Sequence, residues 1–316
     1  MVGGFHRLES MLSPIYRAIE IQNQSEHHWH ADETRWMVYI QIDGKTGHRW
    51  YLWVFQSETT VYFKLAPTRG RTVIDEHFRD SWGIVSVDRY VSYKVLLSTK
   101  RFLLAFCWAH VRRDFLEIEK GYEHLAEWSR VWVERIDQLY HINNRRIALE
   151  VGSPEFTISQ RKLETEVEQF KLDLDKEAEK YEVETLPARR SVLESLRSHW
   201  HGLILFVKYS WVPMDNNSGE RSLRGPVVGR KNYYGSGSLA SSQLTPEMQS
   251  ILGTLDLWDI NCHLWMTSYL GACADNQSQA PDNIDEFLPW KMSEQRLLQL
   301  GSQPESRPKS YSTITR

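Results

Sequence analysis

A run of seven residues in the C-terminal third, DNNSGER over 215–221, combines residue types that suit metal and phosphate chemistry. Asp215 or Asn216 can cap the start of a helix, because their side-chain oxygens accept hydrogen bonds from free backbone N–H groups. Glu220 would then project from the first full turn, on the helix face of Asn216. Four cations follow, with no acidic residue among them: Arg221, Arg224, Arg230 and Lys231. The pattern suits a metal beside a phosphate; taken alone, it also fits a capped, solvated surface helix.

Two aspartates stand at the ends of predicted strands. Asp32 lies in HADET over 30–34, at the start of the first predicted strand, and Asp88 directly follows the apolar run 83–87. The second position is a carboxyl end of the kind where α/β sheets place ligands. Singly, such residues are more often turn or cap residues, and Glu33 could take the role of Asp32.

Together with Glu220, the two aspartates fit a known chemical design. Two aspartates on neighbouring strands and a glutamate on a covering helix can hold two divalent cations roughly 3.5–4 Å apart. One cation activates a water or a hydroxyl, and the other stabilises the leaving oxygen of a phosphodiester. Mg²⁺ suits this arrangement, because it is commonly held by one or two carboxylates plus substrate phosphates.

The positive charge of the chain is local. The formal net charge is −3, so no global cationic field attracts nucleic acid. A second basic set flanks Asp88 and the next predicted strand: Arg89, Lys94, Lys100, Arg101, Arg112 and Arg113. Such patches could contact phosphates near the site, although ordinary solvated faces have the same composition.

The elements that must position these residues form an α/β pattern. Segments rich in β-branched and aromatic residues predict strands over 36–42, 48–55 and 60–65, separated by turns as an antiparallel meander. The next elements are predicted as helix, strand, helix and strand, over 71–79, 83–87, 90–98 and 102–106. This order favours a sheet of mixed direction flanked by helices. A short helix is expected around 12–22.

Beyond Trp108 the strand signals disappear for about a hundred residues, and apolar residues recur at helical spacing in three sets. These sets contain Trp132 and Leu139, then Val167 and Phe170, then Leu196 and Trp200. They predict a helical insertion over 117–210. After the DNNSGER run we expect a flexible Gly-Ser loop over 235–238, a buried helix over 246–270 and a disordered tail over 291–316.

Composition narrows the class of protein. Three cysteines without framework spacing suit a reducing compartment, and no apolar run approaches the roughly 20 residues that span a bilayer. With no basic and apolar leader at the N-terminus, this predicts a soluble cytoplasmic protein without membrane contact. Cys107 and His110 have C-x-x-H spacing, but no second pair completes the four ligands of a zinc site.

Several motifs resemble the transposases of the insertion-sequence-66 family. They are HADET over 30–34, CWAHVRRDF over 107–115, DNNSGERSLR over 215–224, GRKNY over 229–233 and IDEFLPW over 284–290. The resemblance covers roughly residues 12–292 in the family's order. It implies a DDE transposase with a ribonuclease-H-like core that cuts and joins DNA with Mg²⁺ or Mn²⁺, two ions being expected. Asp32, Asp88 and Glu220 would be its catalytic metal ligands.

The resemblance also implies partners and lesser sites. Transposon ends and target DNA would be bound by a homo-oligomer, with accessory proteins of the same element. Six cations would contact DNA phosphates: Arg112, Arg113, Arg221, Arg224, Arg230 and Lys231. Three residues would line the edge of the active site: His110, Asn216 and Asn217. The predicted organisation is an N-terminal remnant over 1–28, a catalytic core over 29–116 and 211–290, and the helical insertion between.

This chain departs from the family at three places. Arg89 follows Asp88 where the family has glycine, Ser218 and Gly219 replace alanine-rich residues, and the family's N-terminal region for DNA recognition and oligomerisation is expected to be missing. An inactive or truncated, transposase-derived DNA-binding or interaction protein is therefore the alternative. A nuclease or glycosidase with an Asp/Glu pair has only the acids in its favour.

Overall fold

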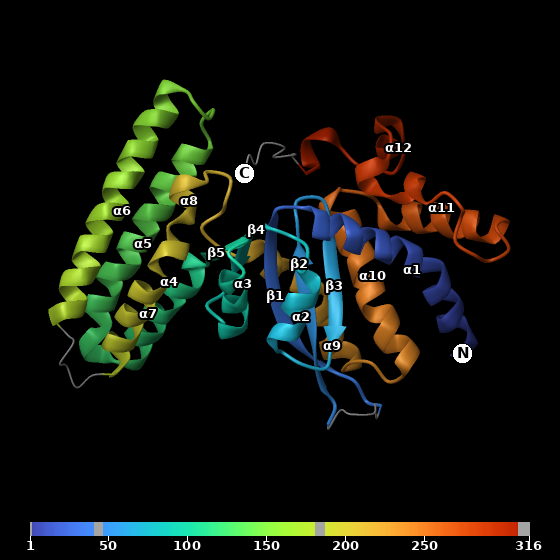
Figure 1. Cartoon of the computed structure of the whole chain (residues 1–316), viewed down its shortest axis with the longest axis horizontal. Coiled ribbons are helices and arrows are strands. Elements are labelled where there is room, and N and C mark those ends of the chain that lie inside the picture. Colours follow the sequence, from blue (N-terminus) through green and yellow to red (C-terminus); the bar gives the residue numbers. More distant parts are fainter. Residues whose placement is uncertain (1, 41–46, 181–186, 309–316) are drawn as a thin grey trace. The chain divides into compact units, whose positions relative to one another are not determined.

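The computed structural model describes residues 2–40, 47–180 and 187–308 (Figure 1). The chain divides into two compact units. The first comprises Met1–Val85, Val91–Phe102 and Asn217–Arg316, and the second comprises Ser86–Tyr90 and Leu103–Asn216. Among the described helices, none is long and apolar enough to cross a membrane.

Five strands form one sheet in the order β3-β2-β1-β4-β5. They are β1 (His28–Met37), β2 (Arg49–Gln56), β3 (Val61–Ala66), β4 (Gly83–Val87) and β5 (Phe102–Phe106). β1, β2 and β3 pair antiparallel, as the predicted meander requires. The predicted fold class is confirmed: the structure is a mixed α/β sheet flanked by helices, consistent with a ribonuclease-H-like core.

The first strand begins at His28, eight residues before the predicted start at Trp36. β1 pairs with β2 from His30 opposite Gln56 to Met37 opposite Arg49. The polar HADET segment has low strand propensity of its own, and its pairing with the aromatic strand β2 overrides that propensity. Asp32 therefore lies inside the strand and not at its start. The predicted strand residues 41 and 42 lie outside the described residues.

The first unit has one sheet face that we call the α9 face, defined by Thr34, Trp36, Leu52 and Val54. These residues share a side of the pleat, and Leu223 of α9 (Asn217–Tyr233) joins Trp36, Leu52 and Val54 in one buried cluster. The opposite face carries a second aromatic cluster, in which Trp53 and Phe55 stack and Phe55 packs edge-on against Phe78. Helix α2 (Arg71–His77), η1 (Val91–Lys94) and α3 (Val95–Ser98) follow β3 and β4 along the chain.

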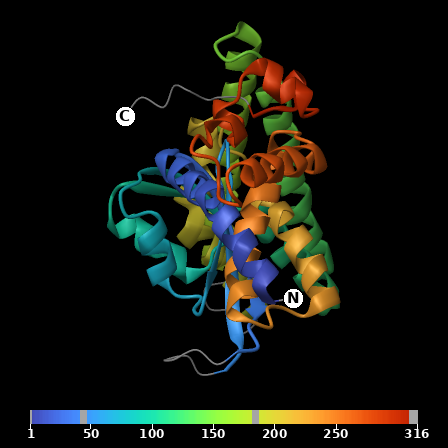
Figure 2. The ribbon, with the colours of Figure 1, turned by 90° about the vertical axis from the view of Figure 1, so that its right-hand side faces the viewer.

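Helix α10 (Leu239–Leu257) covers the outer edge of the sheet. Its Ser250 and Thr254 hydroxyls accept hydrogen bonds from the backbone N–H groups of Phe63 (2.8 Å) and Val61 (3.1 Å) on edge strand β3. Gly253 allows this close approach, because a Cβ there would lie 3.1 Å from the Val61 side chain. Helix α1 (Val2–Ser25) packs along α10 and β3, as both ribbon views show (Figures 1 and 2).

The Gly-Ser segment over 235–238, predicted to be a flexible loop, is ordered and partly buried. Ser236 is 1% exposed and forms a parallel bridge with Val38. Its hydroxyl accepts a hydrogen bond from Trp36 Nε1 at 3.1 Å, and Ser238 caps α10. A Gly-Ser composition predicts only that the backbone of the segment is flexible. It cannot show that the segment pairs with a strand about 200 residues away in sequence.

The C-terminal part contains more order than expected. The predicted helix over 246–270 is wrong, because α10 ends at Leu257 and α11 (Cys262–Asp275) begins separately, capped by Asn261. The predicted disorder over 291–316 is wrong for its first part, since α12 (Glu294–Gln299) buries Leu297. Positions 309–316 lie outside the described residues. Three short 3₁₀ turns complete this part: η3 (Asp285–Phe287), η4 (Pro289–Lys291) and η5 (Pro304–Ser306).

The second unit is a helical bundle. Its elements are α4 (Trp108–Gly121), η2 (Glu123–Leu125), α5 (Ala126–Ile147), α6 (Pro154–Lys180), α7 (Pro187–Leu203) and α8 (Leu205–Lys208). The three predicted apolar stripes are buried, and rings of Trp132, Phe170 and Trp200 meet in the core. The predicted segment 117–210 lies within this unit; its origin as an insertion stays a prediction.

A fully buried arginine ties three helices of this bundle together. Arg146 of α5 is 0% exposed and donates to Asn143 (2.7 Å), to Gln160 of α6 (2.5 Å) and to the Phe206 carbonyl of α8 (2.8 Å). These acceptors are neutral, so burial lowers the pKa of Arg146. The C-terminal carbonyls of a helix are electrostatically suited to a cation, which favours this placement.

Candidate metal and phosphate site

Asp32 lies on the α9 face of the sheet. It stands opposite Val54 in the antiparallel ladder, two residues before Thr34, so the pleat sends its side chain to the same side as Thr34 and Trp36. The carboxylate is partly buried, and its Oδ1 accepts a hydrogen bond from the Glu33 backbone N–H at 2.9 Å.

Two side-chain contacts fix how α9 lies along β1. Ser222 donates to Gln56 Oε1 at 2.7 Å, and Gln56 is the ladder partner of His30. Eight residues later, Arg230 donates to Thr34 Oγ1 at 3.1 Å and to the Arg35 carbonyl. Eight helical residues rise about 12 Å and four strand residues about 13 Å, so helix and strand run side by side in the same direction. The row of Asp32 lies between the two contacts.

Glu220 belongs to the side of α9 that faces the sheet. Positions 220, 223, 227 and 230 fall on one side of a helix with 3.6 residues per turn. Leu223 is buried against the sheet and Arg230 bonds to β1, so this side is the covered one. Glu220 is partly buried one turn before Leu223. The first unit thus packs the helix of Glu220 on the face that carries Asp32.

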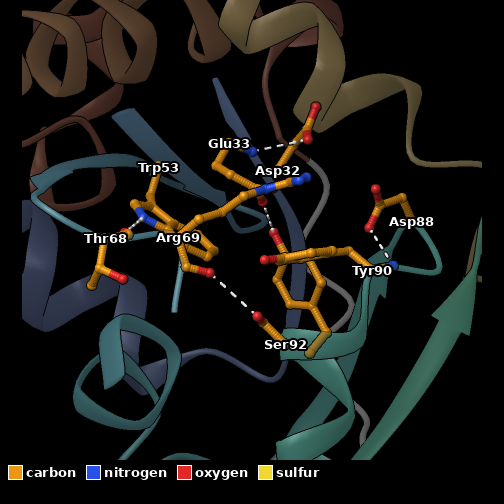
Figure 3. Close-up of polar contacts among 9 residues, drawn as sticks. Asp32, Glu33, Trp53, Thr68, Arg69, Asp88, Tyr90 and Ser92 are labelled. Carbon is orange, nitrogen blue, oxygen red and sulfur yellow. Dashed lines mark hydrogen bonds and ion pairs between the residues drawn. The ribbon is translucent and has the colours of Figure 1, made fainter. Parts of the chain in front are cut away.

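Glu33 is the competing candidate for the role of Asp32, and its side chain is buried on the opposite face of the sheet. Its side chain is 1% exposed, and Arg69 forms an ion pair with its Oε1 at 2.5 Å. Tyr93 donates to Oε2 at 2.6 Å. The Arg69 carbonyl accepts a hydrogen bond from Ser92 (Figure 3). Both carboxylate oxygens therefore have partners, which disfavours Glu33 as a metal ligand. No local sequence pattern predicts the ion pair between Arg69 and Glu33.

Asp88 belongs to the second unit and follows β4 directly, as predicted. Its Oδ1 accepts a hydrogen bond from the Tyr90 backbone N–H at 2.9 Å, which forms a tight turn (Figure 3). Arg89 directs its guanidinium to Asp114 and to the Ser195 hydroxyl at 2.8 Å. The arginine therefore joins β4 to α4 and α7 within this unit.

Three further predicted residues involve the start of α4 and the segment before α9. The Met214 carbonyl accepts from the Trp108 N–H, and the buried Asn216 donates its N–H to Cys107 Sγ at 3.3 Å. This brings Asn216 to the first turn of α4, which also carries His110. Asn217, in contrast, is exposed as the first residue of α9.

Cys107 lies directly before α4 and is buried. The residue is 1% exposed, and burial raises the pKa of its thiol to about 11, although the Asn216 N–H acts in the other direction. Burial therefore favours the neutral thiol of Cys107 over the thiolate.

The predicted phosphate contacts fall into two groups. Arg112 forms two hydrogen bonds with Asp137, at 2.7 and 3.2 Å, and Arg230 is held by β1. Arg113 is exposed on α4. In the part of the chain that the structure describes, three exposed cations of α9 form no ion pair with a carboxylate: Arg221, Arg224 and Lys231. These three keep their charge available for an anionic ligand.

Comparison with known proteins agrees with the motifs. Residues 1–243 match the family model described as "Transposase IS66 family". The uncharacterized protein y4hP of Sinorhizobium fredii (strain NBRC 101917 / NGR234) is 24% identical over 307 residues, which cover 89% of this chain and 53% of that protein. The uncharacterized protein y4jD of the same strain is 25% identical over 219 residues, which cover 66% of this chain and 41% of that protein.

A third relative from that strain, the uncharacterized protein y4qI, is 24% identical over 279 residues, covering 82% of this chain and 50% of the relative. The chain thus spans about half the length of the curated relatives it matches. No solved structure matches this chain.

Proposed function

Because the chain belongs to the IS66 family of transposases, we propose that it provides the catalytic part of a DDE transposase that cleaves and joins DNA at transposon ends. The observation that carries the proposal is the packing of α9, with Glu220 on its covered side, on the sheet face of Asp32. Asp88, at the end of β4, supplies the second aspartate.

The donor set fits divalent cations of the hard type. Asp32, Asp88 and Glu220 offer carboxylate oxygens, the ligands that Mg²⁺ and Mn²⁺ prefer. When bound, two such ions polarise the scissile phosphate and lower the pKa of an attacking water or 3′-hydroxyl. The three carboxylates would fix the ions, with Asp32 held by a strand inside the sheet and Glu220 by a helix pinned at Gln56 and Thr34.

The remaining predicted residues take supporting roles in this proposal. Arg221, Arg224 and Lys231 bind DNA phosphates, since they are exposed and form no ion pair with a carboxylate of the described chain. Arg230 holds α9 on β1. His110, Asn216 and Asn217 would line the edge of the site, and Arg112 and Arg113 of α4 would contact DNA phosphates. Transposition by a homo-oligomer on DNA, with accessory proteins of the same element, completes the proposal.

The substitution Glu220→Gln tests the catalytic role. It removes one anionic oxygen ligand while keeping the size of the side chain, so we expect Mn²⁺-dependent cutting of element-end DNA to fall by at least about 100-fold. The measurement is strand cleavage of labelled DNA that carries the element's inverted repeats. Glu286→Gln, at an exposed position of η3, is the matched control and should cut like the wild type. Full activity of Glu220→Gln would refute the role of this glutamate.

The replacement of glycine by Arg89 keeps an inactive DNA-binding protein as the second candidate. Calorimetric titration with Mn²⁺ separates the two. Metal binding that disappears in Asp88→Asn supports the transposase, whereas wild-type protein that binds DNA but no Mn²⁺ supports the inactive protein. This measurement does not depend on knowing the element's own DNA sequence.

A further inference from the structure

The residue that follows helix α9 is a tyrosine in an unusual backbone conformation. Tyr234 has φ 65°, the left-handed region in which a helix normally places glycine. A bulky side chain there costs conformational free energy, because its Cβ approaches the following carbonyl. Glycine is available one position later, at Gly235, and yet the chain places an aromatic ring at 234.

The backbone around Tyr234 is held on both sides. Its N–H donates to the Arg230 carbonyl at 2.7 Å, and the Ser236 N–H donates to the Met37 carbonyl of β1 at 2.8 Å. Between them, Gly235 has φ 142°, and a Cβ there would lie 2.1 Å from the Met37 carbonyl oxygen. The ring of Tyr234 is therefore presented from a fixed backbone and is 68% exposed.

Two more exposed tyrosines belong to the same place. Tyr233 is 51% exposed and packs its ring edge-on against Trp36 and closely over Gly229. Tyr39 is 48% exposed, and its N–H donates to the Ser236 carbonyl at 2.8 Å, two residues from Tyr234. We call Tyr39, Tyr233 and Tyr234 the tyrosine platform. All three are exposed and stand in or next to the short segment 234–236.

The charge next to the platform has one sign. Arg224 and Lys231 project from one side of α9, about 10 Å apart along its axis, and Lys231 lies one turn before Tyr234. Both are exposed, and neither forms an ion pair with a carboxylate of the described chain. Exposed rings beside free cations are the combination by which proteins hold unpaired nucleic acid: bases stack on the rings and phosphates meet the cations.

We propose that the tyrosine platform binds an unpaired nucleobase of the DNA substrate, with Tyr234 as the stacking ring and Lys231 and Arg224 on the neighbouring phosphates. This inference rests on the proposed function, because it assumes a DNA substrate at α9. It adds a preference for a frayed or single-stranded DNA end over a fully paired one. The fixed backbone lowers the ordering entropy of stacking, which accounts for a ring at a position that favours glycine.

The experiment uses the full chain and two DNA probes of equal duplex length, one blunt and one with a short single-stranded overhang that carries 2-aminopurine. Fluorescence anisotropy measures affinity, and quenching of 2-aminopurine reports stacking. For the wild type we expect tighter binding of the overhang probe together with quenching. In Tyr234→Gly the affinity for the overhang should fall by about 5-fold or more, with quenching lost and blunt-duplex binding retained.

Control variants separate binding from folding. Glycine relieves the left-handed strain, so Tyr234→Gly should melt at the same or a higher temperature than the wild type. Tyr234→Trp should keep both the preference and the quenching. Gln277→Gly removes another exposed side chain at positive φ and should change neither DNA measurement.

Unchanged overhang affinity and quenching in Tyr234→Gly would overturn the inference and leave the proposed function standing. A Tyr234→Gly variant that turns a dimer into a monomer without changing quenching would also overturn it and assign the platform to a second copy of the chain. Wild-type protein that binds neither probe would instead refute the proposed function itself.

Discussion

Asp32 and Glu33 are adjacent in β1 but have different roles, because the pleat of the strand directs their side chains to opposite faces of the sheet. Asp32 shares a face with Trp36 and α9, whereas Glu33 is enclosed on the other face by Arg69 and Tyr93. The sequence motif names both residues and cannot choose between them, since the partners of Glu33 lie 36 and 60 residues further along the chain. Alternation along a strand assigns the faces only after β1 is recognised as a strand.

Substituting each of these two carboxylates by its amide should therefore affect a different property, stability at Glu33 and activity at Asp32. Glu33→Gln weakens a buried, charge-assisted set of hydrogen bonds and should lower the free energy of unfolding by about 2 kcal/mol. Asp32→Asn should change it by less than about 0.5 kcal/mol, while abolishing metal-dependent cutting. Urea unfolding of both variants measures the change in the free energy of unfolding. Equal destabilisation by the two substitutions would show that the pleat does not divide their roles.

At the scale of elements, the strands and helices with strong periodicity are predictable and the connections are not. Strands β2 and β3, helix α2 and the three stripes of the bundle follow from local patterns, whereas the position of β1 does not. The segment over 235–238 does not, because its order comes from pairing with β1. The end of α10 is missed for a related reason: apolar residues continue past Leu257, and the break is made by Asp259 at φ 53° and the Asn261 cap.

The packing of 235–238 on β1 makes a sharp prediction for neighbouring glycines. Gly235→Ala would place a Cβ 2.1 Å from the Met37 carbonyl oxygen at a φ of 142°, and should cost about 2–3 kcal/mol of stability. Gly237→Ala, two residues later, meets no atom within 4 Å and should stay within about 0.5 kcal/mol of the wild type. Thermal melting of both variants tests this, and a stable Gly235→Ala would contradict the ordered segment.

At the scale of the whole chain, the two units are interleaved. The chain leaves the first unit at Ser86, enters the second twice and returns at Asn217. Helix α9, which completes the α9 face, comes from the last segment, so the first unit cannot bury that face until most of the chain is present. The resemblance predicts the order of these parts, but periodicity alone cannot show which distant segments share a core.

One buried carboxyl makes the stability of the first unit depend on pH. Glu247 of α10 is 6% exposed where α1 packs, and its pKa is raised to about 7 by burial and by Glu9, against the effect of Arg17. The folded state binds a proton that the unfolded chain has released above pH 4.5, so stability should fall as pH rises from 4.5 through 7.

Glu247→Gln should remove this slope. At pH 8 the variant should be more stable than the wild type by about 1–3 kcal/mol, because no buried charge remains, whereas at pH 4 the two should unfold alike. Urea titrations across this pH range measure the difference. The exposed control Glu286→Gln should keep the wild-type slope, and a wild type more stable at pH 8 than at pH 5 would argue against a protonated Glu247 at low pH.

The Ser250 and Thr254 contacts to β3 have a consequence for how copies of this protein can associate. An exposed edge strand is a template on which another chain can add a strand through backbone hydrogen bonds. Here the outward N–H groups of Val61 and Phe63 already donate to hydroxyls of α10. Growth of the sheet across β3 is thereby blocked, so copies of the chain cannot associate through backbone hydrogen bonds at this edge.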